Sequence, residues 1–334
     1  MLGQLSRRLS AVIRATFEVE PPDWNEAFAE WRAVEISRDG CRIQLEIPDD
    51  NWGEIDLLVS AVVAGEAMEV GALARCRLVE LEVPNGWLPG PASGASGQRG
   101  NSVGVIVKPS LGLAPHEVAE VARAAVAGGA ALIKDDETLG DPAWCPLDDR
   151  VAAVAKVLEP GVVYCANVSG PVTSLIERSR RAVELGATGL LVNPFAMGLG
   201  ALVALRGAQL GVPVFAHRAG SGPWVRNERF GASGAVLTLL TRLCGADYVI
   251  AGAYGGKLFE TEAEVDANLS AARGPCGSAL PAIVAMGGGL GPDDVGEQVE
   301  RASGKGMVVL LGTRAQRYPG GLEGALRKAV SALD

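Results

Sequence analysis

Eight short apolar runs, separated by longer segments with helical spacing, dominate the chain from about residue 103 onward. The runs are apolar on both faces, as are strands of a parallel sheet that is covered on both sides. Their spacing of roughly 25 to 35 residues leaves room for one helix after each strand. The runs cover residues 103–110, 131–137, 161–170, 189–198, 212–220, 246–256, 280–289 and 306–313.

The intervening segments carry the start and stop signals of helices. One begins at Pro115 and stops at Gly128, and another is bounded in the same way by Pro171 and Gly186. Eight strand–helix units predict an α/β fold, a (β/α)8 TIM barrel, over residues 103–330. A doubly wound open sheet is the alternative, and the count of eight favours the barrel.

The first part of the chain, residues 1–95, predicts a small α+β domain, with residues 84–102, rich in Gly, Pro and Ser, as the linker. Residues 10–20 and 41–48 alternate between apolar and polar residues like half-exposed strands. Residues 22–35 and 66–78 have helical spacing.

Charge and composition exclude several classes of function. The net charge of -9 and the pI of about 5.0 provide no basic face for nucleic acid or anionic lipid. The N-terminal segment is interrupted by arginines, and no apolar run approaches the roughly 18 residues of a membrane span. We therefore expect a cytoplasmic protein with neither a nucleic-acid nor a membrane partner. The six cysteines are isolated from one another, which predicts small buried side chains rather than a zinc site.

In a parallel barrel the chemistry lies at the carboxyl ends of the strands. Unusual polar residues fall there in this sequence. His116 lies at the start of a predicted helix, where a solvated role is expected, whereas His217 follows a strand and is expected to be functional. The strand-end residues are Lys108, Lys134, Asp136, Glu137, Asn167, Asn193, His217, Arg218 and Lys257.

The group from Lys134 to Glu137 has two interpretations. Lys134 and Asp136 alternate along a strand and should point to one side, with Glu137 turning inward as the strand ends and Asp135 pointing the other way. The cluster could be a structural ion-pair network, or a Mg²⁺ site built on carboxylate oxygens. A protonated lysine has no lone pair, so Lys134 either neutralises the carboxylates or is converted to an anion.

Five motifs carry a resemblance to a known family. "VIVKPSLGL", "GGAALIKDDE", "VFAHRAG", "YVIAGAYGGKL" and "MGGG" occur in the order found in the large subunit of ribulose bisphosphate carboxylase (RuBisCO) and its relatives. The resemblance covers most of residues 55–330. The chain is most similar to RuBisCO-like proteins of the form IV type, with a shortened N-terminal domain.

The resemblance implies a role for each matching residue. Lys134 would carry a carbamate derived from CO2 and bind Mg²⁺ together with Asp136 and Glu137. Lys108 would assist proton transfer at the substrate carbonyl, His217 would lie near substrate hydroxyls, Arg218 would bind phosphate, and Lys257 would lie on the mobile sixth loop. Further substrate contacts are expected from Asn167, Gly287, Gly288, Thr313 and Arg314. A homodimer with active sites shared between subunits is implied, in which Glu66 of the partner subunit takes part.

Departures from the family pattern argue against carboxylation. Ser110 replaces a lysine, Ser221 and Ile250 replace histidines, and Met286 replaces a serine. The three-glycine phosphate loop after the last strand has become "LLGTRAQ", and side chains there block the close approach of phosphate to backbone N–H groups.

We therefore expect Mg²⁺-dependent enolisation of a small oxygenated carbonyl compound, of the tautomerase or isomerase type, rather than ribulose bisphosphate carboxylation. Decarboxylation of a β-keto acid through the same enolate is the alternative reaction. The alternative from another class of function is a non-catalytic binding or regulatory protein that kept the fold of the family. Either Lys108 or Glu66 could be the general base.

Overall fold

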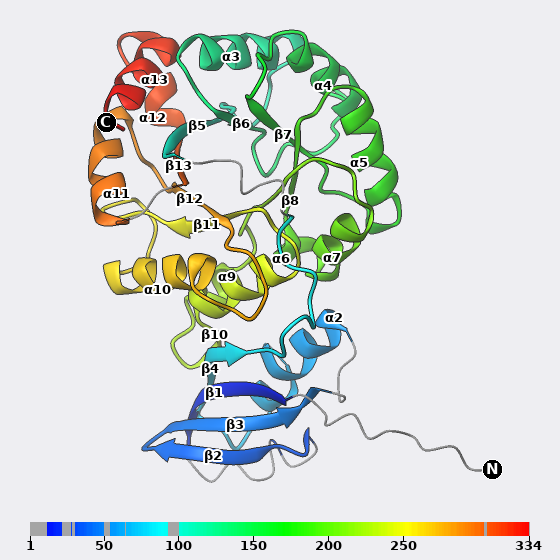
Figure 1. The fold of residues 1–334 in the computed structure, drawn as a ribbon, viewed down its shortest axis with the longest axis vertical. Coiled ribbons are helices and arrows are strands. Elements are labelled where there is room, and N and C mark those ends of the chain that lie inside the picture. The colour runs from blue at the N-terminus through cyan, green and yellow to red at the C-terminus, as the bar shows by residue number, and fades with distance from the viewer. Residues whose placement is uncertain are drawn as a thin grey trace, which may run out of the picture. The chain divides into compact units, whose positions relative to one another are not determined.

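A computed structural model describes residues 12–21, 28, 31–49, 54–63, 65–92, 100–303 and 306–333 of the chain, without the side chain of Glu66. Contacts between Cα atoms divide the chain into two compact units, whose elements are labelled in Figure 1. Unit 1 contains Met1–Trp87 and Ser221–Leu237, and unit 2 contains Leu88–Gly220 and Thr238–Asp334. The sequence did not anticipate that Ser221–Leu237 would group with the N-terminal part of the chain.

Five strands form the sheet of unit 1, in the order β10 (Phe230–Ala232), β4 (Arg75–Glu82), β1 (Val12–Glu20), β3 (Arg42–Pro48) and β2 (Val34–Asp39). β1 is antiparallel to β3 and β4, whereas β10 is parallel to β4. Alternate residues of β1, from Ile13 to Val19, are buried, as the two-residue period of a strand requires. The buried Phe17 ring contacts Phe28, with ring centroids 5.1 Å apart.

The helical spacing of residues 66–78 gave a wrong prediction. Only Glu66–Met68 is helical, as a 3-10 turn, and β4 begins at Arg75. The alternation in "RCRLVELE" buries Cys76, Leu78 and Leu81 against the sheet, so strand pairing outweighs the weak helical period. Most of residues 22–35 lie outside the described residues. The other helical turns of unit 1 are α2 (Ile55–Leu58), a π-helix (Val59–Val63) and α8 (Gly222–Val225).

Unit 2 is built on a closed barrel of eight parallel strands, which confirms the predicted TIM barrel. Each of the eight apolar runs contains one strand, and neighbours along the barrel follow the order β11-β12-β13-β5-β6-β7-β8-β9. These are β5 (Ser102–Ile106), β6 (Leu132–Lys134), β7 (Val163–Asn167), β8 (Gly189–Val192), β9 (Val214–Ala216), β11 (Tyr248–Gly252), β12 (Ile283–Gly287) and β13 (Met307–Leu311).

Helices follow the strands and surround the barrel (Figure 1). The predicted helix start at Pro115 and stop at Gly128 are both confirmed by α3. The helices are α3 (Pro115–Ala127), α4 (Leu147–Ala155), α5 (Leu175–Glu184), α6 (Pro194–Met197), α7 (Gly200–Gly207), α9 (Gly234–Leu243), α10 (Glu262–Arg273), α11 (Val295–Arg301), α12 (Thr313–Gln316) and α13 (Gly321–Ser331), with 3-10 turns at Val172–Ser174 and Pro292–Asp294.

The barrel interior is tightly filled with apolar side chains. Phe215 and Tyr248 stack there with ring centroids 5.7 Å apart, and Leu132, Val308 and Leu310 belong to the same cluster. Gly104 on β5 faces this cluster: a Cβ atom there would lie 2.8 Å from Cγ1 of Val308. The core therefore closes the barrel centre and leaves polar chemistry to the strand ends. No helix in the described part of the chain is long and apolar enough to cross a membrane.

Candidate functional site

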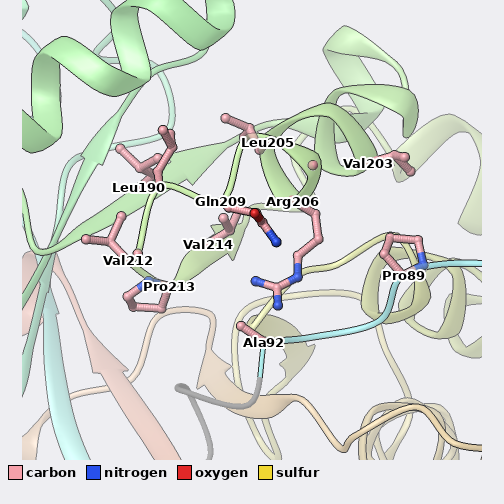
Figure 2. Close-up of a pocket in the computed structure, with 13 residues that line it drawn as sticks. Pro89, Ala92, Leu190, Val203, Leu205, Arg206, Gln209, Val212, Pro213 and Val214 are labelled. Carbon is pink, nitrogen blue, oxygen red and sulfur yellow. The ribbon is translucent and has the colours of Figure 1, made fainter.

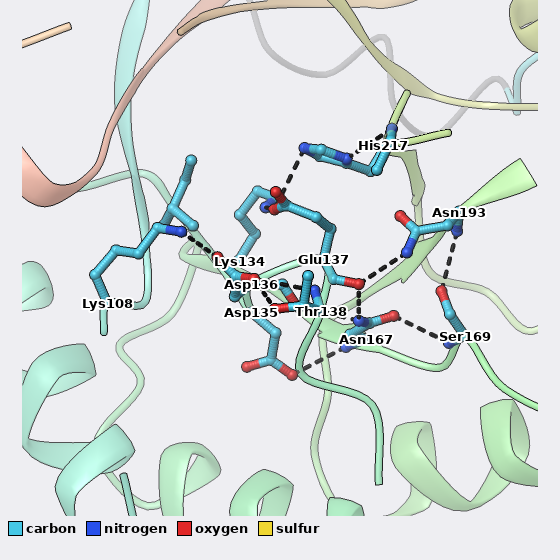
Figure 3. A network of polar contacts seen from close by, with 12 residues as sticks. Lys108, Lys134, Asp135, Asp136, Glu137, Thr138, Asn167, Ser169, Asn193 and His217 are labelled. Atoms are coloured by element: carbon cyan, nitrogen blue, oxygen red, sulfur yellow. Dashed lines mark hydrogen bonds and ion pairs between the residues drawn. The ribbon is translucent and has the colours of Figure 1, made fainter. Parts of the chain in front are cut away.

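Polar side chains from five neighbouring strands form one network of hydrogen bonds and ion pairs (Figure 3). Lys134 is the last residue of β6 and Asn167 the last residue of β7, while Asn193 and His217 directly follow β8 and β9. Lys108 lies two residues beyond the end of β5. Because parallel strands of a barrel all end on the same side, residues distant in sequence meet at this edge.

Lys134 lies at the centre of the network and is fully buried. Its Nζ atom is 3.3 Å from Oε2 of Glu137 and 5.9 Å from the ring centroid of Phe215. Burial lowers the pKa of Lys134, against the opposing effect of the carboxylates of Glu137 and Asp136. The neutral form of this amine is therefore easier to reach by loss of its proton than that of an exposed lysine.

Asp136 is held in its ionised form by donors on two sides. Its side chain is 1% exposed and contacts Nζ of Lys108, while the N–H group of Thr138 donates to Oδ1 over 3.0 Å. Burial alone would raise the pKa of Asp136, but the hydrogen bonds from Lys108 and Thr138 outweigh it, so the pKa is lowered.

Two asparagines fix the backbone that carries these carboxylates. Nδ2 of Asn167 donates to the carbonyl oxygens of Asp136 (3.1 Å) and Glu137 (3.0 Å). Nδ2 of Asn193 donates to the same Glu137 carbonyl over 2.8 Å. Oδ1 of Asn193 is buried, and no described residue donates a hydrogen bond to it. The segment after β6 is thus anchored from β7 and β8 rather than left as a free loop.

His217 completes the network as a neutral ring. Its Nδ1 atom accepts the N–H of Ala219 over 3.1 Å, which places the ring proton on Nε2, 3.4 Å from Oε2 of Glu137. Burial, followed by the charges of Lys134 and Arg218, lowers the pKa of His217 well below 6.5. The imidazole can therefore donate a hydrogen bond at neutral pH without adding positive charge.

Behind the strand, Asp135 forms a second, buried network that sequence reasoning missed. Its carboxylate accepts from Nε of Arg150 (3.0 Å), from the Tyr164 hydroxyl (3.0 Å) and from the N–H of Asn167 (2.9 Å). Asp135 points away from Lys134 and Asp136, as the alternation along the strand predicted. An arginine inside the apolar side of helix α4 was the only signal in the sequence for this partner.

Other predicted residues lie at the ends of later strands. The N–H of Lys257 donates to the carbonyl of Gly288 over 2.8 Å, and a Cβ on Gly289 would lie 2.8 Å from Cγ of Lys257. The glycines after β12 therefore allow the loop of Lys257 to lie against them. Arg314, next to Thr313 in α12, donates to the Gly289 carbonyl over 3.1 Å and pairs with Asp294.

Arg218 forms an ion pair with Glu260, a residue that the sequence analysis did not single out. The side chain of Glu66 lies outside the described residues, so its expected role stays a prediction. Among the described residues, no hydrogen bond or ion pair joins the network of Figure 3 to five other predicted residues: Arg218, Lys257, Gly287, Thr313 and Arg314.

The side chains around Lys134 include oxygen donors of the kind that bind Mg²⁺. The described residues contain no cluster of three His, Cys, Asp or Glu side chains that could hold a metal ion. Asp136 and Glu137 supply two carboxylates, and the buried Lys134 amine lies beside them. A carbamate on Lys134 would provide the third anionic oxygen donor, of the type that Mg²⁺ prefers.

A separate cavity of about 660 Å³ lies at the opposite end of the barrel strands (Figure 2). It is lined by Leu190 of β8 and Val214 at the start of β9, together with Pro89, Val203 and Arg206. Catalytic residues of a parallel barrel lie at the carboxyl ends of its strands. This cavity is therefore not part of the candidate site.

Comparisons with known proteins identify the family of the chain. Residues 95–273, more than half of the chain, match the ribulose bisphosphate carboxylase large chain, catalytic domain. A ribulose bisphosphate carboxylase-like protein of Allochromatium vinosum is 34% identical over 267 residues, which cover 74% of this chain and 58% of that protein. A 2,3-diketo-5-methylthiopentyl-1-phosphate enolase of Geobacillus kaustophilus is 38% identical over 208 residues, covering 56% and 50%. The matched parts thus span 58% and 50% of the lengths of these two relatives.

The fold comparison extends over nearly all of the chain. The crystal structure of a RuBisCO-like protein from Alicyclobacillus acidocaldarius superposes with a TM-score of 0.84 at 27% identity, covering 97% of this chain and 93% of that one. The sequence match and the barrel agree. The chain belongs to the ribulose bisphosphate carboxylase large-chain family, and its similarity is to the RuBisCO-like members.

Proposed function

We propose that this protein is a RuBisCO-like enzyme that enolises a small oxygenated carbonyl compound with the aid of Mg²⁺, and that it does not carboxylate ribulose bisphosphate. The observation that carries the proposal is the fully buried amine of Lys134 beside Glu137 and Asp136. The name of the Geobacillus relative, an enolase, supports the reaction class.

Lys134, as a carbamate, would hold the metal together with Asp136 and Glu137. Carbamylation requires the neutral amine, which burial of Lys134 favours. The attack of this amine on CO2 forms one N–C bond and releases one proton, which leaves the carbamate anion. When bound, Mg²⁺ polarises the substrate carbonyl and stabilises the negative charge that develops on its oxygen.

The chain's own residues would perform the proton transfer and orient the substrate. Lys108 contacts Asp136 and lies at the edge of the network, and we assign it to proton transfer at the carbon next to the carbonyl. His217, neutral and with its proton on Nε2, can donate to a substrate oxygen. Glu66 of the partner subunit is the alternative base if the protein is a homodimer with shared sites.

The test measures metal binding and proton exchange separately. We expect calorimetric titration with Mg²⁺ to show binding that bicarbonate strengthens, and ¹³C-bicarbonate to give a lysine carbamate signal in NMR spectra. Lys134→Met should lose both, whereas Lys156→Met, on the exposed end of α4, should keep both. Equal Mg²⁺ affinity of Lys134→Met and the unchanged protein would refute the metal site.

Enolisation itself is measured as the exchange of carbon-bound hydrogens of small diketones for solvent deuterium. Lys108→Met should abolish the exchange while Mg²⁺ binding remains. If Lys108→Met retains exchange and Glu66→Gln loses it, the partner subunit supplies the base.

A further inference from the structure

Arg218 forms an ion pair with the buried Glu260 beside the candidate site. Arg218 follows His217 at the end of β9, and Glu260 lies in the loop between β11 and α10. β9 and β11 are neighbours in the barrel, and a Cβ on Gly252, the last residue of β11, would lie 3.7 Å from Cδ of Glu260. The pair therefore joins the carboxyl ends of two adjacent strands.

Glu260 is the more buried member of the pair. Its side chain is 2% exposed, against 21% for Arg218. Nη1 of Arg218 contacts Oε1 of Glu260, yet neither carboxylate oxygen accepts a hydrogen bond of ordinary geometry from a described residue. Buried carboxylates normally fill their acceptor capacity, but among the described residues this one is contacted only by Arg218, at Oε1.

The pair also changes the charge at this end of the site. A lone arginine would bind phosphate through two parallel N–H donors. Here the guanidinium is already compensated by a buried carboxylate. A phosphate placed against Arg218 would therefore lie beside Glu260 and be repelled by it.

We propose that Glu260 is a specificity-determining residue, which neutralises Arg218 and selects an uncharged, hydroxyl-bearing end of the substrate in place of a phosphate. A substrate hydroxyl can accept a hydrogen bond from the partly exposed Arg218 without bringing negative charge next to Glu260. This inference rests on the proposed function, because it assigns the pair to the substrate of the same site. It narrows the substrate to compounds without phosphate at this end.

The test uses inorganic phosphate as the probe and requires neither metal nor turnover. We expect Glu260→Gln, which keeps the shape of the side chain and removes its charge, to bind phosphate roughly 10- to 100-fold more tightly than the unchanged protein in calorimetric titrations. Adding Arg218→Met to that variant should remove the gain. Glu323→Gln is the matched control, because it frees the exposed Arg327 on α13 and should bind phosphate no better.

Two outcomes would overturn the inference. One is phosphate affinity that is the same in Glu260→Gln and in the unchanged protein. The other is tight phosphate binding by the unchanged protein that Arg218→Met abolishes. Phosphate binding is measured without Mg²⁺, so it does not depend on the proposed metal site. A failure of the metal-site proposal would be recognised separately, in the Mg²⁺ titration of Lys134→Met.

Discussion

The buried network behind β6 gives a sharp prediction for Asp135→Asn. Asp135 and Arg150 are both fully buried and pair over 3.0 Å, while the Tyr164 hydroxyl donates to the other carboxylate oxygen. Burial alone would lower the pKa of Arg150, but the charge of Asp135 raises it. Asparagine has almost the same shape as aspartate, so the substitution removes the charge and replaces one acceptor oxygen by an amide donor.

The expected cost follows from the lost countercharge. Arg150 keeps hydrogen bonds to the carbonyls of Cys145 (2.8 Å) and Gly140 (2.8 Å), but no carboxylate among the described residues then faces it. Removing one member of a buried ion pair costs about 3–5 kcal/mol. Tyr164→Phe, which removes only one hydrogen bond to the carboxylate, should cost about 1.5–3 kcal/mol.

The assay is urea unfolding followed by far-UV circular dichroism, with Asp135→Asn/Arg150→Met as the matched double variant. Arg150→Met removes the buried positive charge that Asp135→Asn leaves without a countercharge, so the double variant should be more stable than Asp135→Asn alone. A loss below about 1 kcal/mol for Asp135→Asn, or a double variant whose cost is the sum of the two single ones, would refute this reasoning. Nε of Arg150 and the N–H of Asn167 both donate to Oδ2, so an asparagine oxygen in that place keeps both hydrogen bonds and the substitution removes mainly the charge.

Three further predictions concern the core, the pH dependence and the reaction. Gly104→Val should destabilise the protein by about 1–3 kcal/mol in urea unfolding, because its Cβ would lie 2.8 Å from Val308, whereas Gly207→Ala, with open space around it, should not. Burial raises the pKa of Asp247, although the N–H groups of Val214 and Ala92 donate to it. The stability that Asp247 contributes is therefore present below about pH 3.8 and lost as the pH rises through its raised pKa, and Asp247→Asn should remove this part of the pH dependence. Incubation with ribulose bisphosphate and labelled CO2 should give no incorporation, and measurable incorporation would contradict the proposed function.

The barrel was predictable because its strands are apolar on both faces and because Gly and Pro mark the helix ends. The opposite orientations of Lys134 and Asp135 also followed from the two-residue period of a strand. The pairing of Arg218 with Glu260 could not be predicted from the sequence. It depends on a contact between the loops after two strands that are adjacent only in the closed barrel. For the same reason, nothing local in Phe230–Ala232 indicated that it would pair with β4.

The two networks around β6 lie on opposite faces of the strand and have different parts in the site. On one face, Lys134 and Asp136 present a reactive amine and a carboxylate; on the other, Asp135 is fixed by Arg150 and Tyr164. Asn167 connects the faces, since its N–H donates to Asp135 and its side chain holds the carbonyls of Asp136 and Glu137. Rotation of the segment after β6 would break bonds on both faces at once. The positions of the two candidate metal-binding carboxylates are therefore set by the barrel itself, and sequence changes in the segments after later strands, such as the loop of Glu260 and helix α12 with Arg314, need not disturb them.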